Sequence, residues 1–193
     1  MSGAAVRMAR VVAGAAGVVG AALVAVCGLA GFGGLGCYQS VTLGYANQLS
    51  QSPGHGFEAQ YNIAVGETGH DDWVAGLLKV SMAGGAWGLR GADGIGVMGV
   101  LPAGGVDVFF RPALDVFVIG VEEGKAGRED KTWVGIGAEL EAGILARGDD
   151  VGVELGVRVG GDLSYTGQGG GGFCGVFVGL SWESTWDLDF VTR

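Results

Sequence analysis

The chain has 193 residues, a formal net charge of −9, and 42 glycines against only 3 prolines. The glycines follow no every-third-residue period, which excludes collagen, and the mean hydropathy of +0.42 opposes a disordered chain. The acidic balance argues against nucleic-acid binding, because nucleic-acid phosphates would be repelled and no basic cluster offsets that repulsion.

Residues 1–36 are predicted to be a signal peptide or a membrane anchor. Arg7 and Arg10 precede about twenty residues of Ala, Val, Gly and Leu, which is the layout of a secretory signal. The apolar run exceeds the usual length of about 7 to 15 residues, so a retained membrane-spanning helix is the alternative. Small residues in 28–30 offer one site for cleavage by a signal peptidase.

The residues Gly34, Leu35, Gly36 and Cys37 end this segment and resemble the lipobox of bacterial lipoproteins. The resemblance implies that Cys37 is acylated and becomes the mature N-terminus. If Cys37 is not acylated, an oxidising compartment would allow it to form a disulfide with Cys174.

Residues 37–55 lack a clear period and are predicted to be a tether, followed by a β domain over 56–190. In the segment from Phe57 to Val65, every second residue is apolar and the residues between are mostly polar. This period of two is typical of a strand with one apolar face.

Two long alternating segments, 133–146 and 151–165, have opposite phases and are joined by the turn at 147–150, which predicts a hairpin. Placing Ala146 opposite Val151 brings the two apolar faces together. The same register sets Glu139 opposite Arg158 on the other face, where we expect a structural ion pair.

Further alternation continues to residue 190, and about eight strands are expected in all. Pro112 interrupts the run from 106 to 121, which indicates a bulge, a bend or two separate strands. Turns or loops are expected at 91–93, 102–105, 122–131 and 167–172. The predicted fold class is all-β, a small antiparallel up-and-down β-barrel of about eight strands that follows the N-terminal segment.

The apolar faces can point inward, as in a soluble barrel, or outward against lipid, with glycine and paired charges inside. The long unbroken aliphatic faces favour the outward direction. Trp133, Tyr165 and Trp182 are then expected to be aromatic residues at the membrane interface.

The segment from Trp182 to Phe190 alternates toward an aromatic residue and is similar to the closing strand of bacterial outer-membrane barrels. The resemblance implies a location in the bacterial cell envelope, in the outer membrane or facing the periplasm, with membrane lipid as the partner.

No motif predicts an enzyme, a cofactor site or a metal site. The sequence GIGVMG at 94–99 fits the G-x-G-x-x-G dinucleotide pattern, but Pro102 follows where a helix is needed. The adjacent residues His70, Asp71 and Asp72 show no recognisable metal-ligand spacing. We therefore expect a non-enzymatic envelope protein with a structural or interaction role. The alternative is a soluble periplasmic lipoprotein barrel that binds a small apolar ligand.

Overall fold

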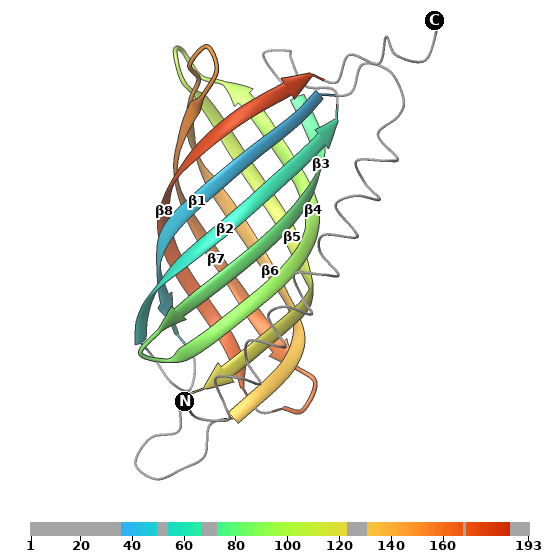
Figure 1. The fold of residues 1–193 in the computed structure, drawn as a ribbon, viewed down its shortest axis with the longest axis vertical. Helices are drawn as coiled ribbons and strands as arrows, with labels where there is room; N and C mark the ends of the chain where they lie inside the picture. Colours follow the sequence, from blue (N-terminus) through green and yellow to red (C-terminus); the bar gives the residue numbers. More distant parts are fainter. Residues whose placement is uncertain (1–35, 50–53, 67–72, 123–130, 168, 186–193) are drawn as a thin grey trace, which may run out of the picture. The chain divides into compact units, whose positions relative to one another are not determined.

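The computed structural model describes residues 36–49, 54–66, 73–122, 131–167 and 169–185. These residues form eight strands, labelled in Figure 1. They are β1 (Gly36–Gln48), β2 (Gly54–Gly66), β3 (Trp73–Gly85), β4 (Gly88–Pro102), β5 (Asp107–Glu122), β6 (Lys131–Ala146), β7 (Gly152–Ser164) and β8 (Gly170–Thr185).

Each strand pairs antiparallel with the next, and β1 also pairs with β8, so the sheet closes into a barrel. This confirms the predicted fold class. Among the described residues, no helix is long and apolar enough to cross a membrane. We call the end where β1 begins and β8 finishes the terminal end, and the other the opposite end.

Side chains alternate between the interior and the outer wall of the barrel, as the period of two predicts. On β7, Val153 and Val157 point outward and are 46% and 53% exposed, whereas Glu154, Arg158 and Asp162 point inward and are at most 4% exposed. The long aliphatic faces therefore form the outside of the barrel. Its interior holds the buried polar and charged side chains together with a buried apolar cluster that includes Trp73, Leu77 and Met98.

The predicted tether contains the first strand, which corrects the predicted boundary. β1 begins at Gly36 and pairs along its whole length with β2 and β8. Its outward residues include Val41 and Leu43, while Ser40 and Thr42 are buried inside. Because its inner face includes the polar residues Ser40, Thr42 and Gln48, the segment resembles a polar linker when its partner strands are not considered.

Strand β4 is continuous through 91–93, where a turn was predicted. The turn lies instead at Ala86 and Trp87. The GIGVMG segment lies in the middle of β4, with Ile95 and Val97 outward. The predicted turn at 102–105 is confirmed, because β4 ends at Pro102 and β5 pairs back along it. The loop predicted at 167–172 is shorter, since β8 begins at Gly170.

The register of the hairpin formed by β6 and β7 differs by two residues from the predicted one. Ala146 pairs with Val153, and Arg158 lies opposite Glu141. The connection is longer than predicted, because β7 begins only at Gly152. A shift of two residues keeps every side chain on the same face, so the apolar pattern alone does not distinguish the two registers.

Pro112 lies within β5, which remains one strand of 16 residues. The irregularity of this strand lies further along. The pairing with β4 shifts between Asp93 and Gly94, and the pairing with β6 shifts between Asp115 and Val118.

Candidate functional site

The barrel interior holds ten charged side chains, each at most 5% exposed. They are the cations of Lys79, Arg90, Arg111 and Arg158 and the carboxylates of Glu58, Asp115, Glu139, Glu141, Glu154 and Asp162. Carboxylates thus outnumber cations by two. Charges this deep require partners, because burial of an unpaired charge is very costly. The contacts group them into two networks.

The Lys79 network occupies the part of the lumen nearer the opposite end. Lys79 on β3 lies 2.7 Å from Oδ1 of Asp115 and is also ion-paired with Glu139. Arg90 on β4 donates to Oδ2 of Asp115 at 2.6 Å and holds both carboxylate oxygens of Asp162, at 2.7 and 2.9 Å. Asp115 is therefore shared by two cations, and five strands, β3 to β7, are tied together.

The Arg158 network lies nearer the terminal end. Nη1 of Arg158 on β7 is 2.8 Å from Oε1 of Glu58 and 3.7 Å from Oε1 of Glu141. Arg111 on β5 lies 2.9 Å from the other oxygen of Glu141 and donates to Glu154 at 2.5 Å. Glu141 thus has the role in this network that Asp115 has in the other.

Neutral side chains complete the Arg158 network. The amide of Gln60 on β2 donates to Glu141 at 2.9 Å and accepts from Arg158 at 3.0 Å. At the terminal end, the hydroxyl of Tyr38 donates to Glu154. Hydrogen bonds of this kind satisfy carboxylate lone pairs that the cations leave open, which stabilises a buried ionic cluster.

Three phenylalanine rings stack on the guanidinium groups. The ring centroids of Phe173, Phe109 and Phe177 lie 4.7, 4.4 and 5.0 Å from the Cζ atoms of Arg90, Arg111 and Arg158, respectively. Each ring also covers a glycine, which is Gly160 for Phe173, Gly143 for Phe109 and Gly156 for Phe177. A Cβ at any of these glycines would collide with the ring. The glycines of the inner face therefore provide room for the rings that pack on the arginines.

Glu139 and Arg158, the predicted ion pair, both point into the lumen but have other partners. Glu139 is paired with Lys79, and Arg158 with Glu58 and Glu141. The prediction named the right face and the right kind of interaction. It named the wrong partners, because the register is shifted and because two of the partners come from β2 and β3.

The three predicted interfacial aromatic residues lie in different environments. Trp133 points into the barrel at its opposite end and is buried, which corrects its predicted role. It occupies an inward position of β6, because it is offset by one residue from the apolar side chains of this strand that face outward. Tyr165 is exposed at the opposite end, and Trp182 lies on β8 near the terminal end, opposite Gln39. For these two, an interfacial role stays a prediction.

Cys37 is the second residue of β1, opposite Val65, and is 7% exposed. Its acylation stays a prediction. The alternative disulfide with Cys174 is wrong, because Cys174 pairs with Asn47, ten residues further along β1. That spacing corresponds to about 33 Å, against at most about 7 Å between the Cα atoms of a disulfide. The residues 70–72, considered as a metal site, lie outside the described residues.

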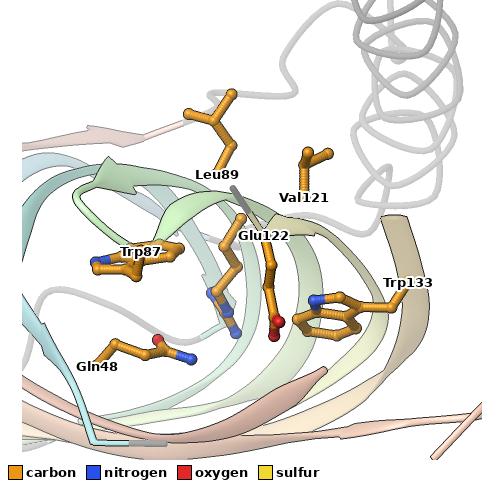
Figure 2. Close-up of a pocket in the computed structure, with 7 residues that line it drawn as sticks. Gln48, Trp87, Leu89, Val121, Glu122 and Trp133 are labelled. Carbon is orange, nitrogen blue, oxygen red and sulfur yellow. The ribbon is translucent and has the colours of Figure 1, made fainter. Parts of the chain in front are cut away.

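At the opposite end, residues from four strands and a turn line a small cavity, and Figure 2 shows the side chains of Trp87, Gln48, Glu122 and Trp133 gathered at it. Trp87 and Trp133 lie on either side of Glu122, and Gln48 and Arg90 also line this cavity. The cavity among them is about 10 Å³, which is room for about one water molecule.

The terminal end has a larger hollow of about 280 Å³. Tyr38 and Ser181 line it together with the turn between β6 and β7, including Asp149 and Asp150. Arg147 lies at its edge and is ion-paired with Asp107. Within the described residues, no group of three or more His, Cys, Asp and Glu side chains could hold a metal ion.

Of the ten network charges, only Glu139 and Arg158 were predicted from the sequence, and the three cations missed are Lys79, Arg90 and Arg111. Each is an isolated cation in the polar phase of an apolar strand. Their position on the inward face could have identified them, because a cation inside the barrel needs a carboxylate from another strand.

No protein-family model matches the chain, and neither does any curated protein. Among solved structures, the barrel is similar to Neisserial surface protein A, with a TM-score of 0.53 and 13% identity, covering 77% of this chain and 96% of that one. Ail of Yersinia pestis follows with a TM-score of 0.45 and 10% identity, covering 79% and 100%. The N-terminal β-barrel domain of Pseudomonas aeruginosa OprF has a TM-score of 0.39 and 12% identity, covering 75% and 97%. At 13% identity, the similarity to the Neisserial protein supports the fold alone, an eight-stranded closed β-barrel.

Proposed function

We propose that this chain is a non-enzymatic integral barrel of the bacterial outer membrane, with a structural or interaction role and a closed lumen. One observation carries the proposal. The outward side chains of the eight strands are mostly apolar and exposed, while the described interior holds ten buried charged side chains beside a cluster of apolar ones. Exposed aliphatic residues around buried charges are the arrangement expected when the solvent is lipid.

Strand length supports a membrane-spanning barrel. The strands have 13 to 16 residues. A tilted strand needs about 9 to 11 residues to cross the hydrocarbon core. The outward residues of β7, from Val153 to Leu163, are aliphatic or glycine along this whole length.

The interior argues against the soluble ligand-binding alternative. Binding of an apolar ligand requires an apolar cavity inside the barrel. The middle of the lumen is instead filled by the two ionic networks and the rings stacked on them. The same filling leaves no room for a substrate beside the buried carboxylates, which supports a role other than catalysis.

Arginine substitutions on the outer wall test the proposal. Val157→Arg near the middle of β7 should destabilise the barrel in lipid vesicles by about 2–4 kcal/mol, whereas Ala146→Arg at the end of β6 should cost at most about 1 kcal/mol. The free energies come from urea titrations followed by tryptophan fluorescence. A Val157→Arg protein that folds in buffer without detergent or lipid would overturn the proposal.

Membrane extraction separates an integral barrel from an acyl anchor. The Cys37→Ser variant, which cannot be acylated at this position, should stay with the membrane after an alkaline carbonate wash. Its release into the soluble fraction in folded form would show that the barrel wall itself does not hold the protein in the membrane.

A further inference from the structure

The two ionic networks of the lumen have the same ratio of charges. The Lys79 network joins two cations, Lys79 and Arg90, to three carboxylates, Asp115, Glu139 and Asp162. The Arg158 network likewise joins two cations to three carboxylates. With every group ionised, each network therefore has one negative charge in excess. Both networks are buried, and a buried net charge is very costly.

One carboxylate in each network has the fewest hydrogen-bond and ion-pair contacts. In the Lys79 network it is Glu139, which is paired with Lys79 through Oε1. Its Oε2 is buried and has no hydrogen-bond partner among the described residues. By contrast, Asp115 lies between two cations, and Asp162 accepts from Arg90 with both oxygens. Glu139 is therefore the carboxylate of this network whose ionised form is least stabilised.

In the Arg158 network, the corresponding residue is Glu58 on β2. Within the described part of the chain, its one ion pair is with Nη1 of Arg158, at 2.8 Å. The same nitrogen also lies 3.7 Å from Glu141. The third carboxylate, Glu154, accepts from two donors of its own. Glu58 thus shares half of a single guanidinium, while the other carboxylates of the network have additional partners.

The charges around these two carboxylates do not supply the missing positive charge. Asp115 and Glu141 also lie within electrostatic range of Glu139, and both are carboxylates. Glu58 lies within electrostatic range of Glu139 and of both cations of the Lys79 network, which are engaged with their own carboxylates. Two carboxylates that act on each other in a buried site do not both ionise readily, because no water screens their repulsion.

A proton is the positive charge that fits these positions. No group of three or more His, Cys, Asp and Glu side chains in the described ranges could hold a metal ion. The ammonium beside Glu139 and the guanidinium beside Glu58 would also repel a metal ion. A proton needs no further ligands, and it turns a carboxylate oxygen into an O–H group that can donate a hydrogen bond.

We propose that the folded barrel binds two protons in its lumen at neutral pH, one on the carboxyl group of Glu139 and one on that of Glu58. Each network is then neutral, with two cations, two carboxylates and one carboxylic acid. Exposed carboxyl groups of an unfolded chain are ionised at this pH, so folding takes up two protons from the solvent. The inference goes beyond the proposed function, because it concerns the lumen and does not depend on which membrane surrounds the barrel.

The pH dependence of unfolding tests the proposal. The two histidines are first replaced, as His55→Gln and His70→Gln, because imidazoles titrate in the same range. Unfolding releases the two protons, so a rise in pH should favour the unfolded chain. Between about pH 6 and 7, the unfolding equilibrium constant from urea titrations in lipid vesicles should rise about hundredfold, since each released proton contributes a factor of about ten per pH unit.

Glutamine substitutions identify the two sites. Glu139→Gln and Glu58→Gln replace a carboxylic acid with an uncharged amide of similar shape. Each variant should therefore reduce the rise to about tenfold per pH unit, and the double variant should show no rise. Asp162→Asn is the matched control, because it alters a carboxylate that accepts from Arg90 with both oxygens. It should destabilise the barrel at every pH but keep the full pH dependence of the parent protein.

Infrared spectra of the protein without substitutions keep the test independent of how the variants fold. At neutral pH, the folded barrel should show the C=O stretching band of protonated carboxyl groups, and this band should vanish on unfolding. An unfolding constant that does not change with pH, a rise that persists in the double variant, or the absence of this band overturns the proposal. So does a stability that follows the concentration of Na⁺ or K⁺ instead of pH, since the missing charge would then be a metal ion.

Discussion

The ring of Phe177 on β8 lies over Gly156 on β7, and a Cβ added to that glycine would be 2.6 Å from Cζ of the ring. The same ring stacks on the guanidinium of Arg158, at 5.0 Å. A bare backbone, an aromatic ring and a buried cation therefore form one packed unit. Glycine at this position is needed for space, since its backbone conformation is one that other residues adopt.

Adding a methyl group under this ring should destabilise the barrel. For Gly156→Ala we expect a loss of about 1–3 kcal/mol in the free energy of unfolding, because the ring must move and disturb its contact with Arg158. Gly161→Ala, on the same strand, is the control. Its nearest neighbour would be 3.5 Å away, so its effect should stay below about 1 kcal/mol. Equal urea midpoints for the two variants in lipid vesicles would contradict the packing described here.

The strands of this barrel are largely predictable from the sequence, because alternation has a physical cause that acts locally. Val153, Val157 and Leu163 point outward as their period of two predicts. The first strand was missed for the same local reason. Ser40 and Thr42 on its inner face are polar, and only the neighbouring strands make that face an interior.

The partners inside the lumen are not predictable in this way. Lys79 is paired with Glu139, and Arg111 with Glu154. In both pairs, the two residues lie far apart in the sequence, on strands that are not neighbours in the barrel. Alternation places each of these residues inside the barrel. Which of them touch depends on barrel closure and on the exact register, and a shift of two residues changes every partner without changing any face.

Removing a shared arginine should be far more harmful than removing an exposed one. Arg111→Met leaves Glu154 without its cation and removes one of the two cations of Glu141 in a buried interior, and we expect a loss of about 3–5 kcal/mol. Arg147→Met is the control. Arg147 is also ion-paired, with Asp107, but it is about one-third exposed at the terminal end, so its loss should be under about 1 kcal/mol. Urea unfolding in vesicles measures both. If the Arg147 variant is affected as strongly as the Arg111 variant, the energetic role assigned to the network is wrong.

The filled lumen predicts a barrel that does not conduct. Vesicles that contain the wild-type protein should be no more permeable to glucose than protein-free vesicles, because the network side chains are at most 5% exposed. Trp133→Ala should widen only the opposite end and leave both networks in place, so permeability should stay low. It should, however, make Trp87 more accessible to iodide, which a fluorescence quenching titration detects. Glucose entry through the wild-type barrel would contradict a closed lumen.

The register of β6 and β7 can be tested by disulfide formation on the outer wall. Ala142 and Val157 are directly opposed. Opposed Cα atoms in an antiparallel pair are about 4.5–5.5 Å apart, which is within the range of a disulfide. The pair Ala142→Cys and Val157→Cys, in a background whose native cysteines are replaced by serine, should therefore crosslink under mild oxidation.

Leu140→Cys with Val157→Cys is the matched control, since these positions are opposed only in the register that the apolar pattern suggested. Their diagonal separation of about 7–8 Å should prevent the bond. Crosslinking is read from gel mobility before and after reduction. Preferential crosslinking of the Leu140 pair would move Arg158 back opposite Glu139, which would remove the geometric basis for Glu141 as the shared carboxylate of its network.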